Sequence, residues 1–186
     1  MSKKVLVPIA DGTEEIEAVT IIDVLRRAGA DVTVASVMPN QLQATASRGV
    51  KLVADQHITG CMDKYYDLIA LPGGMPGAEH LRDSKELIQL LQNQNQAGKL
   101  YAAICAAPAV ALLPHGLLSQ RRATCHPSRM KSFEITDAQV VNERVVVDGN
   151  CITSQGPGTA IEFSLKLVES LFGPEKAKEV AGPMVV

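Results

Sequence analysis

The sequence predicts an α/β domain, a three-layer sandwich in which helices cover a mostly parallel sheet. Short apolar runs of strand length alternate along the chain with longer segments of helical periodicity. Aromatic residues make up only 3% of the 186 residues and Trp is absent, so Val, Ile, Leu and Ala must fill the core, as is typical of buried parallel strands. The length suits one domain over residues 1–186, and no internal repeat divides it.

A β-α-β unit is expected in the first forty residues. A β-rich run covers residues 4–10, helical periodicity covers 14–28, and a second strand is expected over 31–37. Gly29 suits the position just beyond the helix. Because such a crossover is right-handed, the two strands should pair in parallel.

The start of this helix carries polar residues with several possible roles. Asp11, with Glu14 three residues on, fits a capping box, and Thr13 is a rival cap. Glu17 lies in line with an apolar row, so it is either a buried carboxyl with a raised pKa or an ordinary first-turn glutamate. A protonated Glu17 could donate a hydrogen bond to a thiolate or an oxyanion. The two apolar rows of the helix are Ile21, Val24 and Ala28, and Ile16, Val19 and Ile22.

The middle of the chain continues the alternation after a less regular stretch. Residues 42–46 and 50–53 could form a small hairpin or an excursion at the edge of the sheet, and 67–71 is expected to be a strand that ends at Pro-Gly-Gly. A helix is expected over Ser84–Ala97, with its first residue as the N-cap and Gly98 as the stop.

Cys105 stands at the end of the next strand. The apolar run 100–104 has the length of a buried strand, and Pro108 suits the first turn of a helix that ends near Pro114. A strand, a tight turn and a helix start would place the sulfur near backbone N–H groups and a helix dipole, which predicts a lowered thiol pKa. The alternative is a buried cysteine that packs as a small hydrophobe.

The last third completes the expected elements. Residues 123–126 resemble the end of a strand, and 145–147 with 151–153 should form a hairpin around an Asp-Gly turn. A long helix is expected over 160–172, and a last helix begins at about residue 174.

Further candidate site residues follow two other strands. Gly73 and Gly74 come after a strand, where glycine backbone N–H groups could bind an oxyanion, although a plain turn is the alternative. His126 comes at the end of an expected strand, with a structural role as its alternative. Because parallel sheets bind ligands at the carboxyl ends of their strands, that edge could bring these residues together with Cys105.

Composition and charge exclude several function classes. The net charge is −2, with 18 basic and 20 acidic residues and no basic block, so a nucleic-acid surface is not expected. No apolar stretch is long enough for a signal peptide or a membrane span, which favours a cytoplasmic protein. The four cysteines lack C-x-x-C spacing, and His57 with Cys61 completes no metal site, so neither a disulfide framework nor a metal is expected.

Four separated motifs resemble the ThiJ/PfpI superfamily, and more narrowly the subgroup of the parkinsonism-associated protein DJ-one. They are Glu-Glu-Ile-Glu-Ala-Val at 14–19, Leu-Pro-Gly-Gly at 71–74, Ala-Ala-Ile-Cys-Ala-Ala-Pro at 102–108 and Thr-Ser-Gln-Gly-Pro-Gly-Thr at 153–159. The resemblance implies a flavodoxin-like sandwich, a homodimer and no cofactor. The first helix, 14–28, is expected to contribute to the dimer, because two apolar rows exceed what one sheet face covers.

The resemblance also assigns roles to residues. It makes Cys105 the reactive cysteine on a strained elbow, Glu17 the protonated glutamate beside it and His126 the nearby histidine. The remaining pocket residues that it implies are the backbone oxyanion groups of Gly73, Gly74 and Ala106, and the basic residues Arg27 and Arg48 near the pocket and the dimer contact.

Some departures from related families narrow the function. Ala106 stands where protease-like members carry His, and His126 is followed by Pro-Ser rather than by the x-Glu of amidotransferases, so a Cys-His-acid triad is not expected. Ala46 and Val53 stand where the human relative has further cysteines, so a redox role would rest on Cys105.

Two classes of function remain open. The resemblance implies a cofactor-free glyoxalase III that converts methylglyoxal or glyoxal to a hydroxy acid, or a deglycase that removes early glycation adducts from side chains through the same site. The competing class is a redox sensor or redox-regulated chaperone, in which Cys105 is oxidised to a sulfinate.

Overall fold

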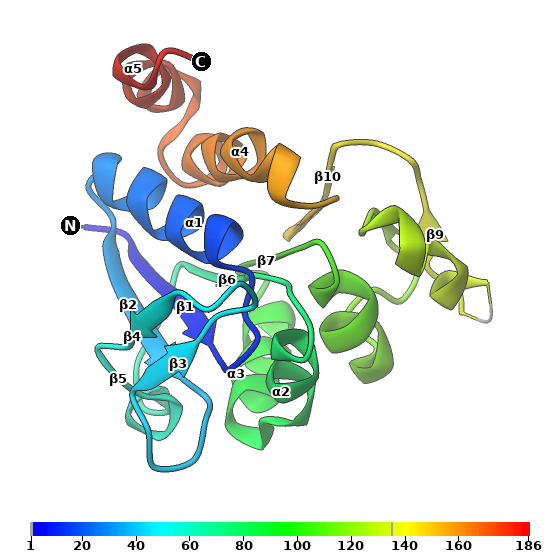
Figure 1. Cartoon of the computed structure of the whole chain (residues 1–186). Helices are drawn as coiled ribbons and strands as arrows, with labels where there is room; N and C mark the ends of the chain where they lie inside the picture. Colours follow the sequence, from blue (N-terminus) through cyan, green and yellow to red (C-terminus); the bar gives the residue numbers. More distant parts are fainter. Residues whose placement is uncertain (1, 135) are drawn as a thin grey trace.

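A seven-stranded sheet forms the centre of the protein in a computed structural model that describes residues 2–134 and 136–186 (Figure 1). Its strand order is β10-β11-β7-β6-β1-β2-β5, and only β10 runs antiparallel to its neighbour. The strands are β1 Lys4–Ile9, β2 Asp31–Ser36, β5 Gln56–His57, β6 Leu68–Leu71, β7 Leu100–Ile104, β10 Val145–Asp148 and β11 Cys151–Ser154. The inner strands are apolar and buried on both faces, which is typical of a parallel sheet between helical layers.

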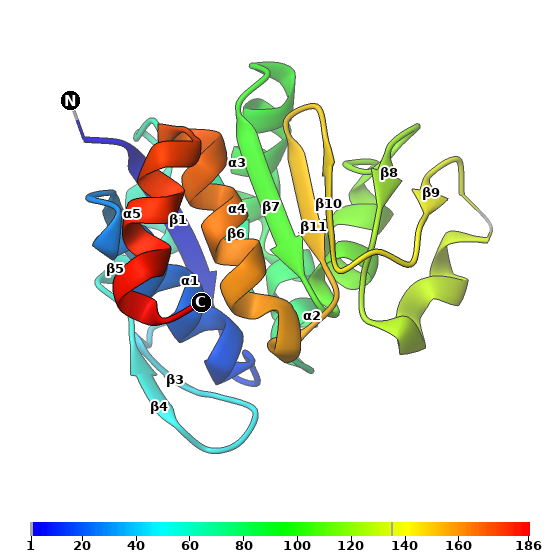
Figure 2. The same cartoon turned by 90° about the horizontal axis from the view of Figure 1, so that it is seen from above.

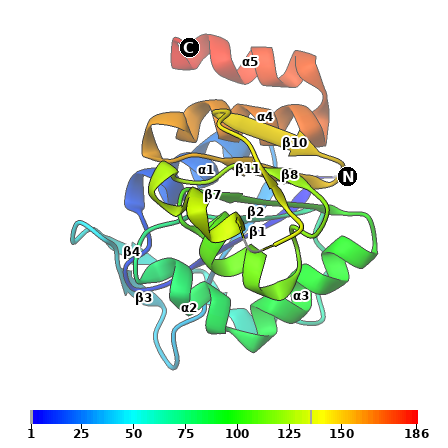
Figure 3. The ribbon, with the colours of Figure 1, turned by 90° about the vertical axis from the view of Figure 1, so that its right-hand side faces the viewer.

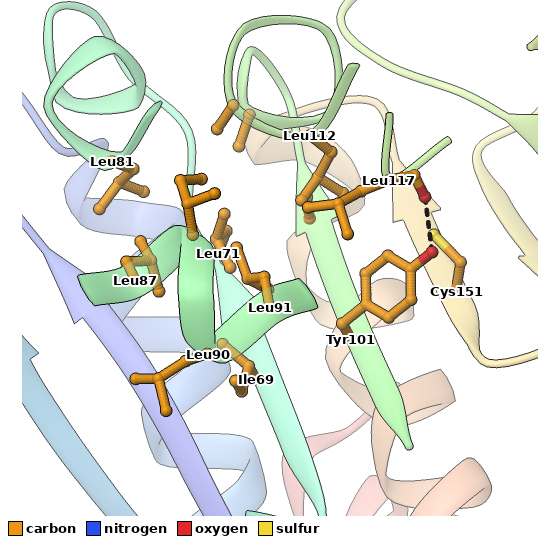
Figure 4. Packing of buried hydrophobic residues seen from close by; sticks show 14 of the residues in the cluster. Ile69, Leu71, Leu81, Leu87, Leu90, Leu91, Tyr101, Leu112, Leu117 and Cys151 are labelled. Atoms are coloured by element: carbon orange, nitrogen blue, oxygen red, sulfur yellow. Dashed lines mark hydrogen bonds between the residues drawn. The ribbon is translucent and has the colours of Figure 1, made fainter. Parts of the chain in front are cut away.

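Helices cover both faces of the sheet, which confirms the expected three-layer α/β sandwich (Figure 3). On one face lie α1 (Glu15–Arg27) and α4 (Ala160–Phe172), with α5 (Pro174–Met184) packed outside α4. On the other face lie α2 (Gly77–Asp83) and α3 (Lys85–Gln96). Leucines of α3 pack against β6 and β7 in this second layer, as Figure 4 shows.

Two smaller pairs of strands stand apart from the main sheet. The hairpin, one of the two alternatives for this stretch, is present as β3 (Gln43–Thr45) and β4 (Lys51–Val53), and it projects beside the start of α1 (Figure 2). At the opposite edge, β8 (Arg122–Ala123) pairs in parallel with β9 (Gln139–Val140). Of the strand end expected at 123–126, only Ala123 lies in a strand, and that strand is outside the main sheet.

The helix expected after Cys105 is irregular. A π-helical stretch covers Pro108–Leu112, and a 3₁₀ turn covers Leu113–His115. Proline donates no backbone hydrogen bond, so Pro114 interrupts regular α-helical bonding. The short helix α2 was not expected from the sequence, because its seven residues are too few for a clear periodic pattern.

The expected caps of α1 are wrong. Glu14 is the N-cap, and its side chain accepts a hydrogen bond from the Glu17 N–H at 2.8 Å. Thr13 instead accepts a bond from the Ala10 N–H, and Asp11 accepts one from the Thr45 N–H in the hairpin. The side chains that local spacing predicted to cap α1 instead accept hydrogen bonds from residues outside the helix.

Candidate active site

Cys105 occupies a strained elbow directly after β7. Its φ of +66° lies in the left-handed region, which non-glycine residues seldom adopt. The peptide N–H of Cys105 donates to the Ser154 carbonyl at 2.9 Å, and its carbonyl accepts from the His126 N–H at 2.8 Å. These two bonds hold the elbow between β11 and the loop after β8, so the surrounding structure maintains the strained conformation.

The elbow leaves no room for a side chain at position 73, so this residue must be glycine. A Cβ on Gly73 would lie 2.7 Å from the Cβ of Cys105 and 2.8 Å from the Ile104 carbonyl oxygen, both closer than side chains pack. Its N–H donates to Glu17 Oε2 at 2.7 Å. Because the Gly73 N–H already donates to the Glu17 carboxyl, it is not available for the oxyanion binding that the sequence had led us to expect.

Glu17 is completely buried in the first turn of α1, as the first of the two sequence-based alternatives requires. Burial raises the pKa of its carboxyl from an ordinary 4.5 to about 7, although hydrogen bonds from the Gly73 N–H and the Cys105 thiol lower it. Oε1 has no hydrogen-bond partner of normal geometry among the described residues. This carboxyl is therefore able to hold or release a proton near neutral pH.

The Cys105 thiol shares its surroundings with that carboxyl. Burial and the negative charge of an ionised Glu17 raise the pKa of Cys105 to about 12. Hydrogen bonds from the N–H groups of Gly74 and Ala106 favour the thiolate and partly offset this rise. The lowered pKa expected from the elbow and the helix dipole is therefore wrong for the state in which Glu17 is ionised. When Glu17 holds the proton, its charge disappears and its O–H becomes a donor to sulfur. The thiolate form of Cys105 thus depends on a protonated Glu17.

A cavity of about 330 Å³ opens at the carboxyl edge of the sheet beside Cys105. It brings together three of the regions singled out by the sequence, namely the Gly73-Gly74 turn, the cysteine elbow and the His126 loop. Its lining residues are Glu14, Ser47, Arg48, Gly74, Met75, Cys105, Ala106, His126, Ser128, Arg129 and Pro157.

His126 reaches this cavity from a loop and not from the main sheet. It caps a 3₁₀ turn over Pro127–Phe133, where its Nδ1 accepts from the Ser128 N–H at 3.3 Å and contacts Ser128 Oγ at 2.8 Å. A ring nitrogen that accepts carries no proton, so the neutral imidazole presents its N–H at Nε2.

The two arginines implied by the resemblance lie in different places. Arg48 lines the cavity from the hairpin loop, where the Glu15 carboxylate accepts from the Arg48 N–H and from Ser47 Oγ, each at 2.8 Å. Arg27 lies in the last turn of α1, pairs with Asp23 at 2.6 Å and does not line the cavity.

Sequence reasoning missed several lining residues. Arg129 and Ser128 follow His126 within three positions, and Met75 follows the double glycine, so proximity to the recognised motifs was the available signal. Within residues 2–134 and 136–186, no group of three or more His, Cys, Asp or Glu side chains could hold a metal ion. No helix in this part of the chain is long and apolar enough to cross a membrane.

Comparison with known proteins gives consistent matches. The model of the DJ-1/PfpI family matches residues 3–170. Protein DJ-1 homolog B from Arabidopsis thaliana is 52% identical over 185 residues; the match covers all of this chain but 42% of that protein, so this chain spans less than half of its relative. Glutathione-independent glyoxalase DJR-1.2 from Caenorhabditis elegans is 37% identical over 183 residues, which cover 98% of this chain and 95% of that protein. The solved structure of oxidized DJ-1 from Toxoplasma gondii superimposes with a TM-score of 0.95 at 49% identity, covering 99% of this chain and 98% of that one.

Proposed function

The chain belongs to the DJ-1/PfpI family, and from this premise we propose that it is a glutathione-independent glyoxalase that converts methylglyoxal or glyoxal to a hydroxy acid without a cofactor. The family membership confirms the resemblance inferred from the four motifs. The observation that carries the proposal is the Cys105 thiol on a left-handed elbow, coupled to the buried Glu17 carboxyl. The name of the C. elegans relative supports the reaction class.

The first step uses the single proton that the pair shares. With that proton on Glu17, the Cys105 thiolate attacks the aldehyde carbon of methylglyoxal, and a C–S bond forms as the carbonyl becomes an alkoxide. The N–H groups of Gly74 and Ala106, which already face the sulfur, stabilise this oxyanion. Glu17 then transfers its proton to the alkoxide, which leaves a neutral hemithioacetal and a Glu17 carboxylate.

The second step moves a proton between carbons. The Glu17 carboxylate removes the proton from the former aldehyde carbon to give an enediol, and a proton is returned to the neighbouring carbon. The product is a thioester of lactate on Cys105. Water hydrolyses the thioester, releasing lactate and restoring the thiol, so no external oxidant or reductant is consumed. His126, whose Nε2–H is not used in the capping bond, assists proton transfer.

Consumption of methylglyoxal by the reduced protein in the absence of glutathione tests the proposal, with lactate measured as the product. We expect turnover by the native chain and none by Cys105→Ser, because a hydroxyl is a much weaker nucleophile than a thiolate. Cys151→Ser is the matched control, because Cys151 is buried away from the cavity, and it should retain turnover. Equal turnover by Cys105→Ser would refute the assignment.

A deglycase reaction would use the same nucleophile. Early adducts of dicarbonyls on Cys, Lys or Arg side chains carry the same reactive carbon, and a cavity open to solvent can admit such side chains. Release of free amine from a glycated lysine peptide, measured beside methylglyoxal turnover in the same variants, separates the two activities.

A redox role is a second candidate, favoured by the accessibility of one thiol. Cys105 is 9% exposed and lines the cavity, whereas Cys61, Cys125 and Cys151 are at most 2% exposed. Two equivalents of hydrogen peroxide would convert the thiolate first to a sulfenate and then to a sulfinate, with one water released in each step. Mass spectrometry after peroxide treatment, with the loss of turnover followed in parallel, tests whether Cys105 takes up two oxygens before the other thiols react.

Homodimer formation through α1 is part of the proposal. Ile16 of α1 is 56% exposed and Val53 of the adjoining hairpin is 68% exposed, so apolar side chains face solvent on both elements. Sedimentation should give a dimer mass that Ile16→Glu lowers. A monomer mass independent of concentration would contradict this.

A further inference from the structure

The arginines of this chain divide into two groups by their partners. Of eight arginines, five pair with a carboxylate and Arg121 donates to the Asp148 carbonyl and to the side-chain oxygens of Asn95 and Asn150. The five paired residues are Arg26, Arg27, Arg82, Arg122 and Arg144. Neither Arg48 nor Arg129 has a carboxylate partner among the described residues, and both line the cavity beside Cys105.

Among the residues that line the cavity, the two arginines outnumber the carboxylates, although the Glu15 carboxylate lies close by and accepts the Arg48 N–H. Glu14 is the acidic residue among those that line it, and its Oε2 accepts the N–H of Glu17 as the cap of α1. Within the described part of the chain, the Arg48 guanidinium makes one hydrogen bond, a long one of 3.2 Å to the Ser47 carbonyl, so most of its N–H donors are available. The other lining residues add no further carboxylate.

We propose that Arg129, together with Arg48, forms an anion-binding rim, and that the substrate of Cys105 therefore carries a carboxylate or a phosphate near its reactive carbonyl. A guanidinium binds either oxyanion through paired N–H donors. The substrate class follows from the proposed function, since the carbonyl is the group attacked by Cys105. The anion binding itself is independent of turnover.

Alkylation of Cys105 tests the rim without any catalytic step. Iodoacetate and iodoacetamide both react when the thiolate attacks their CH₂ carbon and iodide leaves, and they differ mainly in charge. Both rates are proportional to the fraction of Cys105 that is thiolate, so their ratio does not depend on the pKa of Cys105. We expect the ratio of iodoacetate to iodoacetamide at Cys105 to exceed that of N-acetylcysteine amide by about tenfold or more, as in a cleft of one charge sign.

The variants identify the groups responsible. Arg129→Gln should lower the ratio about tenfold, Arg129→Lys should restore part of it, and Arg48→Gln should lower it by a smaller factor because its side chain is exposed. Arg122→Gln is the matched control, since Arg122 pairs with Glu143 and does not line the cavity. A ratio in the native chain equal to that of the small thiol, or one unchanged in Arg129→Gln, would overturn the proposal.

Turnover then identifies the oxyanion. We expect kcat/KM for 4,5-dioxopentanoate or for 3-phosphooxy-2-oxopropanal to exceed that for neutral 2-oxopentanal by about tenfold, and the larger of the two values identifies the preferred anion. Arg129→Gln should reduce this preference. If none of these 2-oxoaldehydes nor methylglyoxal is converted, the proposed function fails, while a raised alkylation ratio still establishes the rim. If 2-oxopentanal is converted as well as both anions, the proposed function stands and the proposed substrate class is wrong.

Discussion

Two buried cysteines lie at opposite ends of the same pair of strands and differ in what surrounds their thiols. Cys151 begins β11 and lies in register with Tyr101 at the start of β7, whereas Cys105 follows the end of β7 and bonds to Ser154 at the end of β11. Burial is the largest influence on both thiols, and the pKa of each is raised to about 12. The two thiols are therefore alike in the property that usually distinguishes a reactive cysteine.

Their surroundings account for the difference. Cys151 sits in the core beside Tyr101 and Leu117 (Figure 4), and its hydrogen-bonding neighbour is the Tyr101 hydroxyl, which stays protonated at neutral pH. Cys105 faces a cavity and a carboxyl whose pKa is about 7. In the proposed mechanism, burial keeps the Cys151 thiol unreactive, whereas the Glu17 carboxyl can take the proton of Cys105.

The largest expected effect comes from removing that acid. Glu17→Gln keeps the shape and the acceptor for the Gly73 N–H but cannot take up or release a proton. Turnover of methylglyoxal should fall by roughly 10²–10⁴-fold, the usual contribution of general acid–base catalysis. The pKa of Cys105, followed by thiolate absorbance, should fall below its value beside an ionised Glu17, because that negative charge is gone. Unchanged turnover would remove Glu17 from the mechanism.

The second effect is on stability as a function of pH. The folded chain keeps the Glu17 proton up to about pH 7, while the unfolded chain releases it near 4.5. The associated stability is therefore fully present below pH 4.5 and is lost as the pH rises through 7, a change on the order of 3 kcal/mol. The free energy of unfolding in urea, native chain minus Glu17→Gln, should decrease by that amount from pH 4.5 to 8. If the free energies of unfolding of the native chain and of Glu17→Gln change with pH in the same way, Glu17 ionises as an exposed carboxyl does.

Alkylation compares the two thiols directly. Iodoacetamide at pH 7.5 should modify Cys105 at least about tenfold faster than Cys151, because Cys151 reacts only when the surrounding core opens. Glu17→Gln should change the rate at Cys105 and leave the rate at Cys151 as it was. Peptide mapping by mass spectrometry gives both rates in one experiment, and equal labelling would end the distinction between them.

The smallest effect concerns the other end of the strand pair. Tyr101→Phe removes the hydroxyl that donates to the Leu117 carbonyl at 2.6 Å, a buried bond. Unfolding should become easier by about 1 kcal/mol, while methylglyoxal turnover stays at the native value because Tyr101 does not line the cavity. A large loss of turnover in a folded Tyr101→Phe variant would mean that the two ends are coupled through β7.

Local patterns located most elements of the fold. The helix expected over 160–172 coincides with α4, and Ser84 caps α3 by accepting the Leu87 N–H. The hairpin around the Asp-Gly turn appears as β10 and β11. These predictions succeeded because period, caps and turn residues act within a few positions of each other. The caps of α1 failed because Asp11 and Thr13 bond to other segments.

The sequence by itself determined which residues are unusual, because Cys105, Glu17 and the double glycine stand where local chemistry makes them informative. Only the tertiary structure decided how they work together. The Gly73 N–H donates to the Glu17 carboxyl at 2.7 Å, and this hydrogen bond joins residues 56 positions apart in the sequence. Arg129 lines the cavity from the 3₁₀ turn that follows His126, where the sequence has no helical period, and Arg27 lies at the far end of α1. Hydrogen bonds and pKa shifts depend on distance and burial, and both are set by how distant segments pack.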